Sequence, residues 1–593
     1  CYASDAVFGG VSFKDGEGIA ALTAYLTEVE KMKRFGFTTG EIQRAKDNII
    51  SHLEKAVEAA GSRKNGDFVD PLLNNFYQNE SYLEPELAYQ LAQGLCGQLN
   101  AQILNQLLGQ IQFITDENMI VLYNGPSKEG SIIPTEEEIR NVLAEVKTIE
   151  VKPNAEEAVN EPFISEDLKG SPVKKTAETV YGATEWTLKN GVKVVVLPTE
   201  LKKDQVIFNI TKKGGKTLIA TEDLPSFEDN IWSLYLEYAG ISKFAGKNVP
   251  KMLAGKSLSV SPYIGGSRHG VNGSSTPKDL ETALQIAYLY FTAPRFDESE
   301  YMTGINQIKA VLPNLEKMPQ LKLQKLIRET LYGGHDRVLT INSELVEKAN
   351  IADFEKASRR LFGNVAGATV YVVGNVDAET LKPLVTKYIA SLPGGKKGSK
   401  FIDRKEDIVN GNVVKDEAMV METPKSTVLQ VYTADMPYSV KNEVLLDIAK
   451  LYLDMVYVET LRESEGGTYG AGVATVCGRE PKDVAILQVV FETNPESAEK
   501  LSKLAVEGVQ KIITEGIPAD KFDMILKNVQ KNIPQDRISN SYWGSTLQKF
   551  VEFGDKYDNE YEEAVNTATP EAVVEAVKKL VEADNFIQLI VSP

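Results

Sequence analysis

A strand-like run followed by two amphipathic helices occurs near both ends of the chain, within residues 6–49 and 484–533. A glycine separates the helices of each pair, Gly36 in one copy and Gly516 in the other, and apolar residues recur at helical spacing around each break. Such a unit is too small to bury its apolar face alone, so its repetition predicts several copies of one domain type. The strand-like runs themselves are predicted at residues 6–13 and 484–491.

Three further apolar runs, rich in β-branched and aromatic residues, predict buried strands that follow helices. They are residues 118–125, 368–375 and 585–591. A β-hairpin is predicted in residues 186–197, because Asn190-Gly191 is a favoured two-residue turn between apolar runs. The chain is therefore expected to consist of repeated units that each mix helices with strands.

Two segments of linker composition separate the units. Residues 152–178 are rich in Pro, Glu, Lys and Ser, and residues 393–400 are rich in Gly and Lys. Neither segment has a steady apolar period, which is typical of linkers. A chain of 593 residues is too long for one hydrophobic core, so three or four domains are expected, with boundaries near 175 and 400.

The net charge of −18 argues against nucleic acid and anionic membrane as partners. No apolar run approaches the ~20 residues that span a bilayer. Residues 1–5 have neither the basic start nor the apolar core of a signal peptide. Cys1, Cys96 and Cys477 form no close pair and no metal-like spacing, so the fold is not expected to depend on disulfides.

The main candidate for chemistry is the segment Leu-Arg-Glu-Ser-Glu-Gly-Gly-Thr-Tyr-Gly at residues 461–470, which ends a long apolar helical run and opens a strand. Gly466 and Gly467 tolerate the positive φ that a tight corner needs. Such a corner can project the guanidinium of Arg462 and the phenol of Tyr469 into one cleft. These donors can hold a peptide carbonyl and stabilise the oxyanion that forms when water attacks it. Arg462 and Tyr469 are therefore the candidate catalytic residues.

This segment resembles the arginine–tyrosine motif of the pitrilysin/insulinase family of zinc peptidases, the inverzincins, and the hairpin at 186–197 resembles the opening of a pitrilysin-type domain. The resemblance implies an α+β fold of repeated domains, each an antiparallel-rich sheet with helices packed on one face. It also implies that about three of an expected four domains are present. They are a partial second domain at 1–150, a linker between halves at 151–177, a non-catalytic third domain at 178–395 and a fourth domain at 400–593 that carries the Arg/Tyr motif.

The family's zinc motif, His-x-x-Glu-His, appears nowhere in the chain. In the third domain the segment at 232–238 resembles a degenerate copy, in which Leu234 and Tyr238 replace the histidines and only Glu237 survives; a plain core helix is the alternative. No metal site is predicted, and each histidine is expected to be a surface or packing residue. The histidines are His52 on a helix, His269 in a Gly/Ser-rich hairpin turn and His335 in a Gly-Gly-His-Asp segment.

The resemblance implies a zinc-dependent endopeptidase that hydrolyses peptides in an enclosed chamber, with zinc in the intact enzyme and its ligands outside this chain. Arg462 would hold the substrate backbone and Tyr469 would donate to the oxyanion. The expected partners are a peptide substrate and a missing N-terminal zinc-bearing domain or partner subunit, and the chain alone is expected to be inactive. Two alternatives stay open: a non-catalytic scaffold or partner subunit of a zinc peptidase pair, and a peptide-binding chamber. A periplasmic or secreted location is expected, with the cytoplasm as the alternative.

Overall fold

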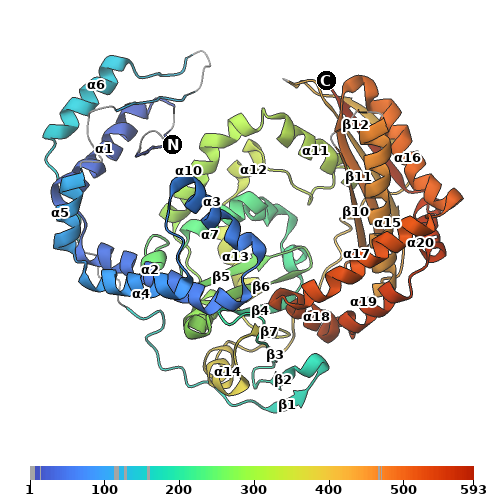
Figure 1. Ribbon diagram of the computed structural model, residues 1–593, viewed down its shortest axis with the longest axis horizontal. Helices are drawn as coiled ribbons and strands as arrows, with labels where there is room; N and C mark the ends of the chain where they lie inside the picture. Colours follow the sequence, from blue (N-terminus) through green and yellow to red (C-terminus); the bar gives the residue numbers. More distant parts are fainter. Residues whose placement is uncertain are drawn as a thin grey trace. The chain divides into compact units, whose positions relative to one another are not determined.

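The computed structural model describes residues 7–13, 15–111, 119–125, 130–155, 161–421, 423–464, 466, 468 and 470–593. The chain divides into two compact units (Figure 1). Unit 1 consists of Cys1–Ser165 and Phe244–Leu258, and unit 2 of Glu166–Lys243 and Ser259–Pro593. No sequence signal indicated that the short segment 244–258 would join the N-terminal unit.

The regular elements that lie wholly within the described part of unit 1 are helices. The helix pair predicted around Gly36 is confirmed: Gly36 has a φ of 67° and separates α1 from α2, which begins with a capping box at Thr38 and Glu41. The helices are α1 (Gly18–Phe35), α2 (Thr39–Ala59), α3 (Val69–Gln78), α4 (Pro85–Gln98), α5 (Ala101–Ile111), α6 (Glu136–Glu145) and the short α8 (Val249–Met252).

The strands predicted in unit 1 are not formed by its described residues. Residues 7–13 and 119–125 belong to no strand in the structure. An alternating apolar run becomes a strand only when another strand satisfies its backbone hydrogen bonds, and among the described residues of unit 1 no such neighbour is present. Both runs are apolar, but the prediction that they form strands is wrong for the described residues.

Unit 2 contains a seven-stranded mixed sheet with the order β1-β2-β3-β7-β4-β6-β5. The predicted hairpin is confirmed, since β2 pairs antiparallel with β3 in a register that places Thr187 opposite Lys193. The strand predicted at 368–375 is β7, which runs parallel to β3 and antiparallel to β4. The strands are β1 (Lys175–Glu178), β2 (Thr184–Thr187), β3 (Lys193–Pro198), β4 (Val206–Lys213), β5 (Leu258–Ile264), β6 (Arg268–Ser275) and β7 (Thr369–Gly374).

The helices that accompany this sheet are α7 (Asp229–Tyr238), α9 (Leu280–Thr292), α10 (Glu298–Leu315), α11 (Pro319–Tyr332), α12 (Ser343–Lys348), α13 (Ile351–Phe362) and α14 (Ala378–Leu384).

A second, five-stranded sheet has the order β10-β11-β9-β12-β8, in which only β8 and β12 are parallel. Its β11 and β12 confirm the strands predicted at 484–491 and 585–591, and the helix pair predicted around Gly516 is α16 and α17. The strands are β8 (Val413–Ala418), β9 (Ser426–Ala434), β10 (Ala471–Gly478), β11 (Val484–Thr493) and β12 (Phe586–Ser592). The helices are α15 (Val440–Tyr457), α16 (Ala498–Glu515), α17 (Ala519–Arg537), α18 (Asn540–Phe553), α19 (Tyr557–Asn566) and α20 (Pro570–Glu582).

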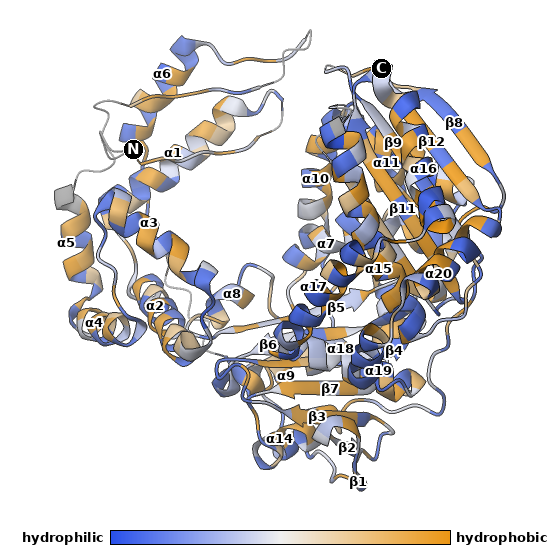
Figure 2. Cartoon of the chain, turned by 45° about the vertical axis from the view of Figure 1, so that its right-hand side comes forward, coloured by the Kyte–Doolittle hydropathy of each residue, from blue (hydrophilic) through white to orange (hydrophobic). Residues whose placement is uncertain are grey.

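An apolar core of unit 2 lies between the five-stranded sheet and its helices α15, α16, α17 and α20. Figure 2 shows the apolar colouring of these strands. The two sheets also exchange helices. Leu331 of α11 packs against β9 and β12, and Leu547 of α18 packs against β3 and β7. Unit 2 is therefore interlocked, because each sheet has one face covered by a helix from the other sheet's portion of the chain.

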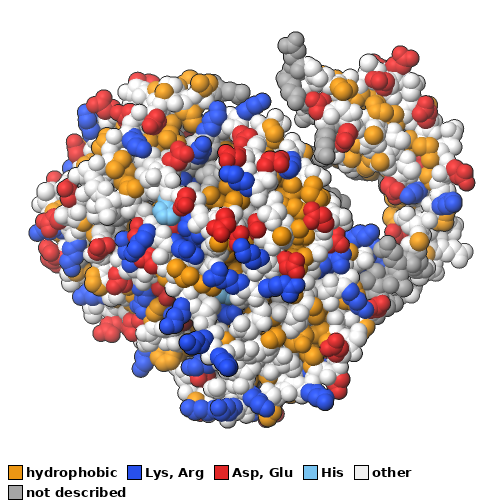
Figure 3. Space-filling view, turned by 180° about the vertical axis from the view of Figure 1, so that it is seen from behind, with side chains coloured by type: hydrophobic (Ala, Val, Ile, Leu, Met, Phe, Trp, Pro, Cys, Tyr) orange, Lys and Arg blue, Asp and Glu red, His pale blue; other side chains and the backbone are white. Residues whose placement is uncertain are grey.

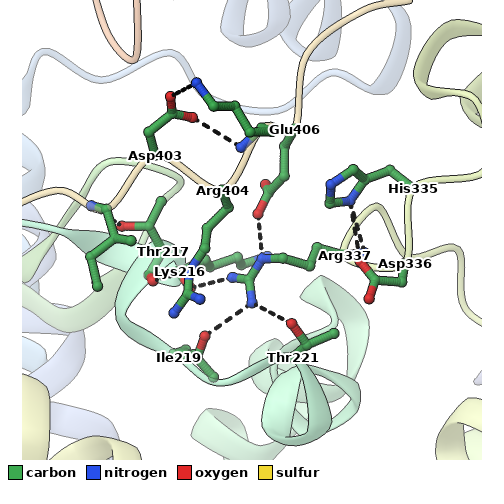
Figure 4. Close-up of polar contacts among 12 residues, drawn as sticks. Lys216, Thr217, Ile219, Thr221, His335, Asp336, Arg337, Asp403, Arg404 and Glu406 are labelled. Carbon is green, nitrogen blue, oxygen red and sulfur yellow. Dashed lines mark hydrogen bonds and ion pairs between the residues drawn. The ribbon is translucent and has the colours of Figure 1, made fainter.

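A buried arginine fixes the segment that follows the Gly/Lys-rich linker (Figure 4). Arg337, which is 8% exposed, donates to the carbonyl oxygens of Ile219 at 3.0 Å and Lys216 at 2.8 Å, and its Nε lies 2.5 Å from Glu406 Oε1. Arg404 adds a bond from its Nε to the Thr217 carbonyl at 2.9 Å. The chain between the two sheets is thus held by charge-assisted hydrogen bonds rather than left as a free tether.

The surface carries mixed charge, and Figure 3 shows Lys and Arg side chains interspersed with Asp and Glu over one face. In the part of the chain that the structure describes, every helix is too short or too polar to cross a lipid bilayer.

Candidate functional site

The helix turn that carries Arg462 is anchored in the core of unit 2. Helix α15 continues past Tyr457 into a π-helical segment, Val458–Ser464. Leu461 in this segment is 0% exposed, whereas its neighbour Arg462 is exposed. Tyr457 is also 0% exposed and donates its hydroxyl to the Ala505 carbonyl at 2.7 Å. Arg462 is therefore an exposed cation on a rigid base, and π-helical turns of this kind are frequent at functional sites.

The corner after this turn has the predicted backbone conformation where it is described. Gly466 has a φ of 61°, and its N–H donates to the Arg462 carbonyl at 3.0 Å. The Thr468 hydroxyl bonds both the N–H and the carbonyl of Gly470, at 3.1 and 3.0 Å. Tyr469 and Gly467 lie outside the described residues, so the approach of Arg462 to Tyr469 stays a prediction.

Two carboxylates of α15 tie the helix to strand β10, which follows the corner. Asp454 Oδ1 accepts a hydrogen bond from the Val473 N–H at 3.3 Å, and Asp447 Oδ1 accepts one from the Thr475 hydroxyl at 3.0 Å. Burial raises the pKa of Asp447 above its ordinary value. These bonds fix α15, which precedes the 461–470 segment, to β10, which follows it.

The second predicted position, on α7, is filled by packing. Leu234 and Tyr238 lie against α10 at Gly304, where an added Cβ would meet their side-chain atoms at 3.4 to 3.5 Å. The Tyr238 hydroxyl donates to Gln307 Oε1 at 2.7 Å, and Glu237 is exposed. An alkyl group and a phenol packed in this way do not fit zinc, whose protein ligands are thiolate, imidazole and carboxylate.

His269 lies in strand β6 and not in a turn, which corrects the sequence prediction. It is 0% exposed; the Gly215 N–H donates to Nδ1 at 3.3 Å and Nε2 lies 3.0 Å from the Leu361 carbonyl oxygen. Burial, followed by the neighbouring Lys212, lowers the pKa of His269 to about 4. Among the residues that the structure describes, no cluster of three or more His, Cys, Asp or Glu could hold a metal ion.

Lys212 is a buried cation that the sequence did not single out. It is 4% exposed, and its Nζ donates to the carbonyl oxygens of Leu361 at 2.8 Å and Asn364 at 2.7 Å, at the C-terminal end of α13. Burial lowers the pKa of this ammonium to about 8. Lys212 and His269 are direct partners in the β4–β6 register. Their shared acceptor lies about 150 positions from Lys212 along the chain, so no local pattern could reveal the arrangement.

Comparison with known proteins relates this architecture to zinc peptidases. Residues 353–529 match the family model described as the Peptidase M16 inactive domain. The chain is 23% identical to the probable zinc protease PqqL of Escherichia coli over 97% of its own length and 61% of that protein. It is also 23% identical to a zinc protease PQQL-like protein of Arabidopsis thaliana, over 89% of this chain and 54% of that protein. The crystal structure of the periplasmic protease PqqL from Escherichia coli superimposes with a TM-score of 0.67 at 19% identity, over 97% of this chain and 63% of that one.

The two sheets with their helices therefore have the fold of pitrilysin-type M16 peptidase domains. The match of residues 353–529 to an M16 domain and the homology to the zinc protease PqqL confirm the resemblance and the predicted fold class. It spans about three-fifths of the length of the Escherichia coli relative and about half of the Arabidopsis relative, whose matched shares are 61% and 54%.

Proposed function

We propose that the chain is part of a zinc-dependent metalloendopeptidase and supplies its substrate-binding residues but not its zinc ligands. The observation that carries the proposal is the exposed Arg462 on a turn anchored by Leu461, inside the segment that matches an M16 peptidase domain. Arg462 would hold a backbone carbonyl of the peptide, because a guanidinium offers several donors in a fixed geometry. Tyr469 would donate its phenolic proton to a hydrogen bond with the oxyanion.

The zinc ligands would lie outside this chain. The homologues are named zinc proteases, but the position on α7 where a motif could stand is occupied by Leu234 and Tyr238, packed on Gly304. Histidines at positions 234 and 238 would pack against α10 and could not surround a metal ion. The domains predicted at 178–395 and 400–593 are accordingly proposed to be non-catalytic and motif-bearing, respectively.

The apolar surface of unit 1 supports a polypeptide partner. Its described residues bury only a few apolar side chains, namely Ile42, Cys96, Val142, Val146, Phe163 and Phe244. Many large apolar side chains are exposed instead, among them Phe8 at 92%, Leu122 at 88%, Ile120 at 82% and Phe76 at 80%. Apolar surface on this scale marks a contact site in a soluble protein. We propose that the zinc-bearing domain or partner subunit covers it, and that residues 1–150 form part of the second pitrilysin-type domain.

The test uses a preparation that joins this chain to a zinc-bearing M16 domain and cleaves a fluorogenic peptide in a chelator-sensitive manner. Tyr469→Phe should lower kcat by roughly a hundred- to a thousandfold, because an oxyanion donor is lost. Arg462→Ala should mainly raise KM, and Tyr452→Phe on α15 serves as the matched control. All three should keep the melting temperature of the unaltered chain. Normal turnover by Tyr469→Phe would refute the assigned role, and cleavage by the chain alone would refute the missing zinc site.

A second candidate, a non-catalytic scaffold or partner subunit, is favoured by the match to a domain described as inactive. The third candidate function is a chamber that binds peptides without hydrolysing them. Restoring a zinc-bearing domain separates them: a scaffold would support cleavage without needing Arg462 or Tyr469, and a chamber would bind unfolded peptides and leave them intact. The periplasmic protease among the structural relatives supports a periplasmic or secreted location for this chain.

A further inference from the structure

A cavity of about 380 Å³ lies among α15, α17, α18 and α19 in unit 2, the last three of which are drawn at the lower right of Figure 1. No residue of the proposed peptidase function lines it. Its volume is within the range of small-molecule and side-chain sites. Its walls carry three tyrosines and three charged side chains, which are Tyr542, Tyr557, Tyr561, Asp447, Asp536 and Lys549.

Two of the three tyrosines donate hydrogen bonds to residues that do not line the cavity. The Tyr557 hydroxyl donates to Glu443 Oε1 at 2.9 Å, and the Tyr542 hydroxyl donates to Asp558 Oδ1 at 2.7 Å. Tyr561 packs beside Tyr557 with ring centroids 5.6 Å apart. These rings need no rearrangement to receive a ligand, so a ligand pays little ordering entropy to them.

The charges of the cavity favour a cation. Asp447 and Asp536 contribute two carboxylates, whereas Lys549 is the one cation among the described lining residues. Lys549 is already engaged: its Nζ lies 3.2 Å from the Tyr557 ring centroid and 3.5 Å from Glu443 Oε1. The lining therefore has an excess of negative charge beside aromatic faces, which attract cations through the negative face of the ring.

One of the lining side chains has a buried hydroxyl group. Thr546 lines the cavity and is 1% exposed. Its hydroxyl makes no hydrogen bond of good geometry within the described part of the chain, although it interacts with the Tyr542 hydroxyl. This hydroxyl is therefore part of the buried wall beside Tyr542.

We propose that this cavity is a binding site for an organic cation, with the guanidinium of an arginine side chain as the best match. Asp447 and Asp536 act as counter-ions, and Tyr542 and Tyr561 contact the apolar stem and the flat face of the head group. The site involves neither Arg462 nor Tyr469, although α15, which contributes Asp447, continues into the turn that carries Arg462.

The test measures binding to the full chain by isothermal calorimetry with Nα-acetyl-arginine amide and its uncharged isostere, Nα-acetyl-citrulline amide. The citrulline compound should bind at least about tenfold more weakly, because it lacks the positive charge that strengthens hydrogen bonds to the two carboxylates. Asp536→Asn should weaken arginine binding by about the same factor. Asp523→Asn, on the same helix α17 and paired with Lys527, should leave it unchanged.

Asp447→Asn is a second variant whose fold is checked by its melting temperature, because Asp447 also holds Thr475. A pentapeptide with a central arginine distinguishes the sources of the cation: tighter binding than the single amino acid indicates a peptide side chain, and equal binding indicates a free guanidinium compound. Equal affinity for the arginine and citrulline compounds, no effect of Asp536→Asn, or no binding of the arginine compound at millimolar concentration would overturn the proposal.

Discussion

Acid should destabilise unit 2 through His269, and the contacts of this residue give the size of the effect. The Gly215 N–H donates to Nδ1, so Nδ1 must be an acceptor, and Nε2–H donates to the Leu361 carbonyl. Only the neutral imidazole satisfies both bonds. The nearby ammonium of Lys212 further disfavours a second positive charge. The structure therefore selects neutral His269, and burial holds its pKa at about 4 against an ordinary value of 6.5.

The direction in which the free energy of unfolding changes with pH depends on proton binding to the folded and unfolded states. Between pH 6.5 and about 4 the unfolded chain binds a proton at this histidine and the folded chain does not, so the free energy of unfolding falls as the pH falls. Above pH 6.5 the stability is fully present, and below about pH 4 no more is lost at this site. The loss is roughly 2 kcal/mol at pH 5 and approaches roughly 3 kcal/mol in stronger acid, at about 1.4 kcal/mol per pKa unit.

The assay is urea unfolding followed by tryptophan fluorescence between pH 4.5 and 7.5. Trp186, Trp232 and Trp543 are the three tryptophans of the chain, and all lie in unit 2. His269→Gln removes the titrating group, so the decline in stability below pH 6.5 should be smaller by roughly 2 kcal/mol at pH 5. His52→Gln, at an exposed position of α2 in unit 1, is the matched control. If His269→Gln shows the same decline as the unaltered chain, the neutral buried imidazole is not the cause.

Two further predictions concern the stability of unit 2. Arg337→Lys should lower the free energy of unfolding of unit 2 by about 2 kcal/mol, since one ammonium cannot reproduce the forked bonds to Ile219, Lys216 and Glu406. Arg360→Lys, on the exposed face of α13, is the control and should change this free energy little. If Arg337→Lys is as stable as the unaltered chain, Arg337 does not have this role. Leu461→Ala should cost about 2–5 kcal/mol, because the side chain is 0% exposed; denaturant unfolding that shows a loss below about 1 kcal/mol would mean that Leu461 does not anchor the turn.

Periodicity and local turn chemistry were enough to predict much of the secondary structure of unit 2. The hairpin at Asn190-Gly191, the strands β7, β11 and β12, and the helix pair α16–α17 follow from patterns within a few residues. The same rules failed for residues 7–13 and 119–125, where an apolar run found no neighbouring strand among the described residues. A strand depends on a distant partner, and a helix mostly on its own backbone bonds.

The sequence by itself predicted the resemblance to pitrilysin-type peptidases, the helix–corner–strand that carries Arg462, and the lack of a His-x-x-Glu-His motif, because these depend on residue identity at fixed local spacing. Only the tertiary structure decided the burial of His269 beside Lys212, the exchange of α11 and α18 between the two sheets, and the tyrosine-lined cavity. Each of these joins residues far apart in the chain. Their contacts depend on how whole sheets and helices pack, which no local pattern records.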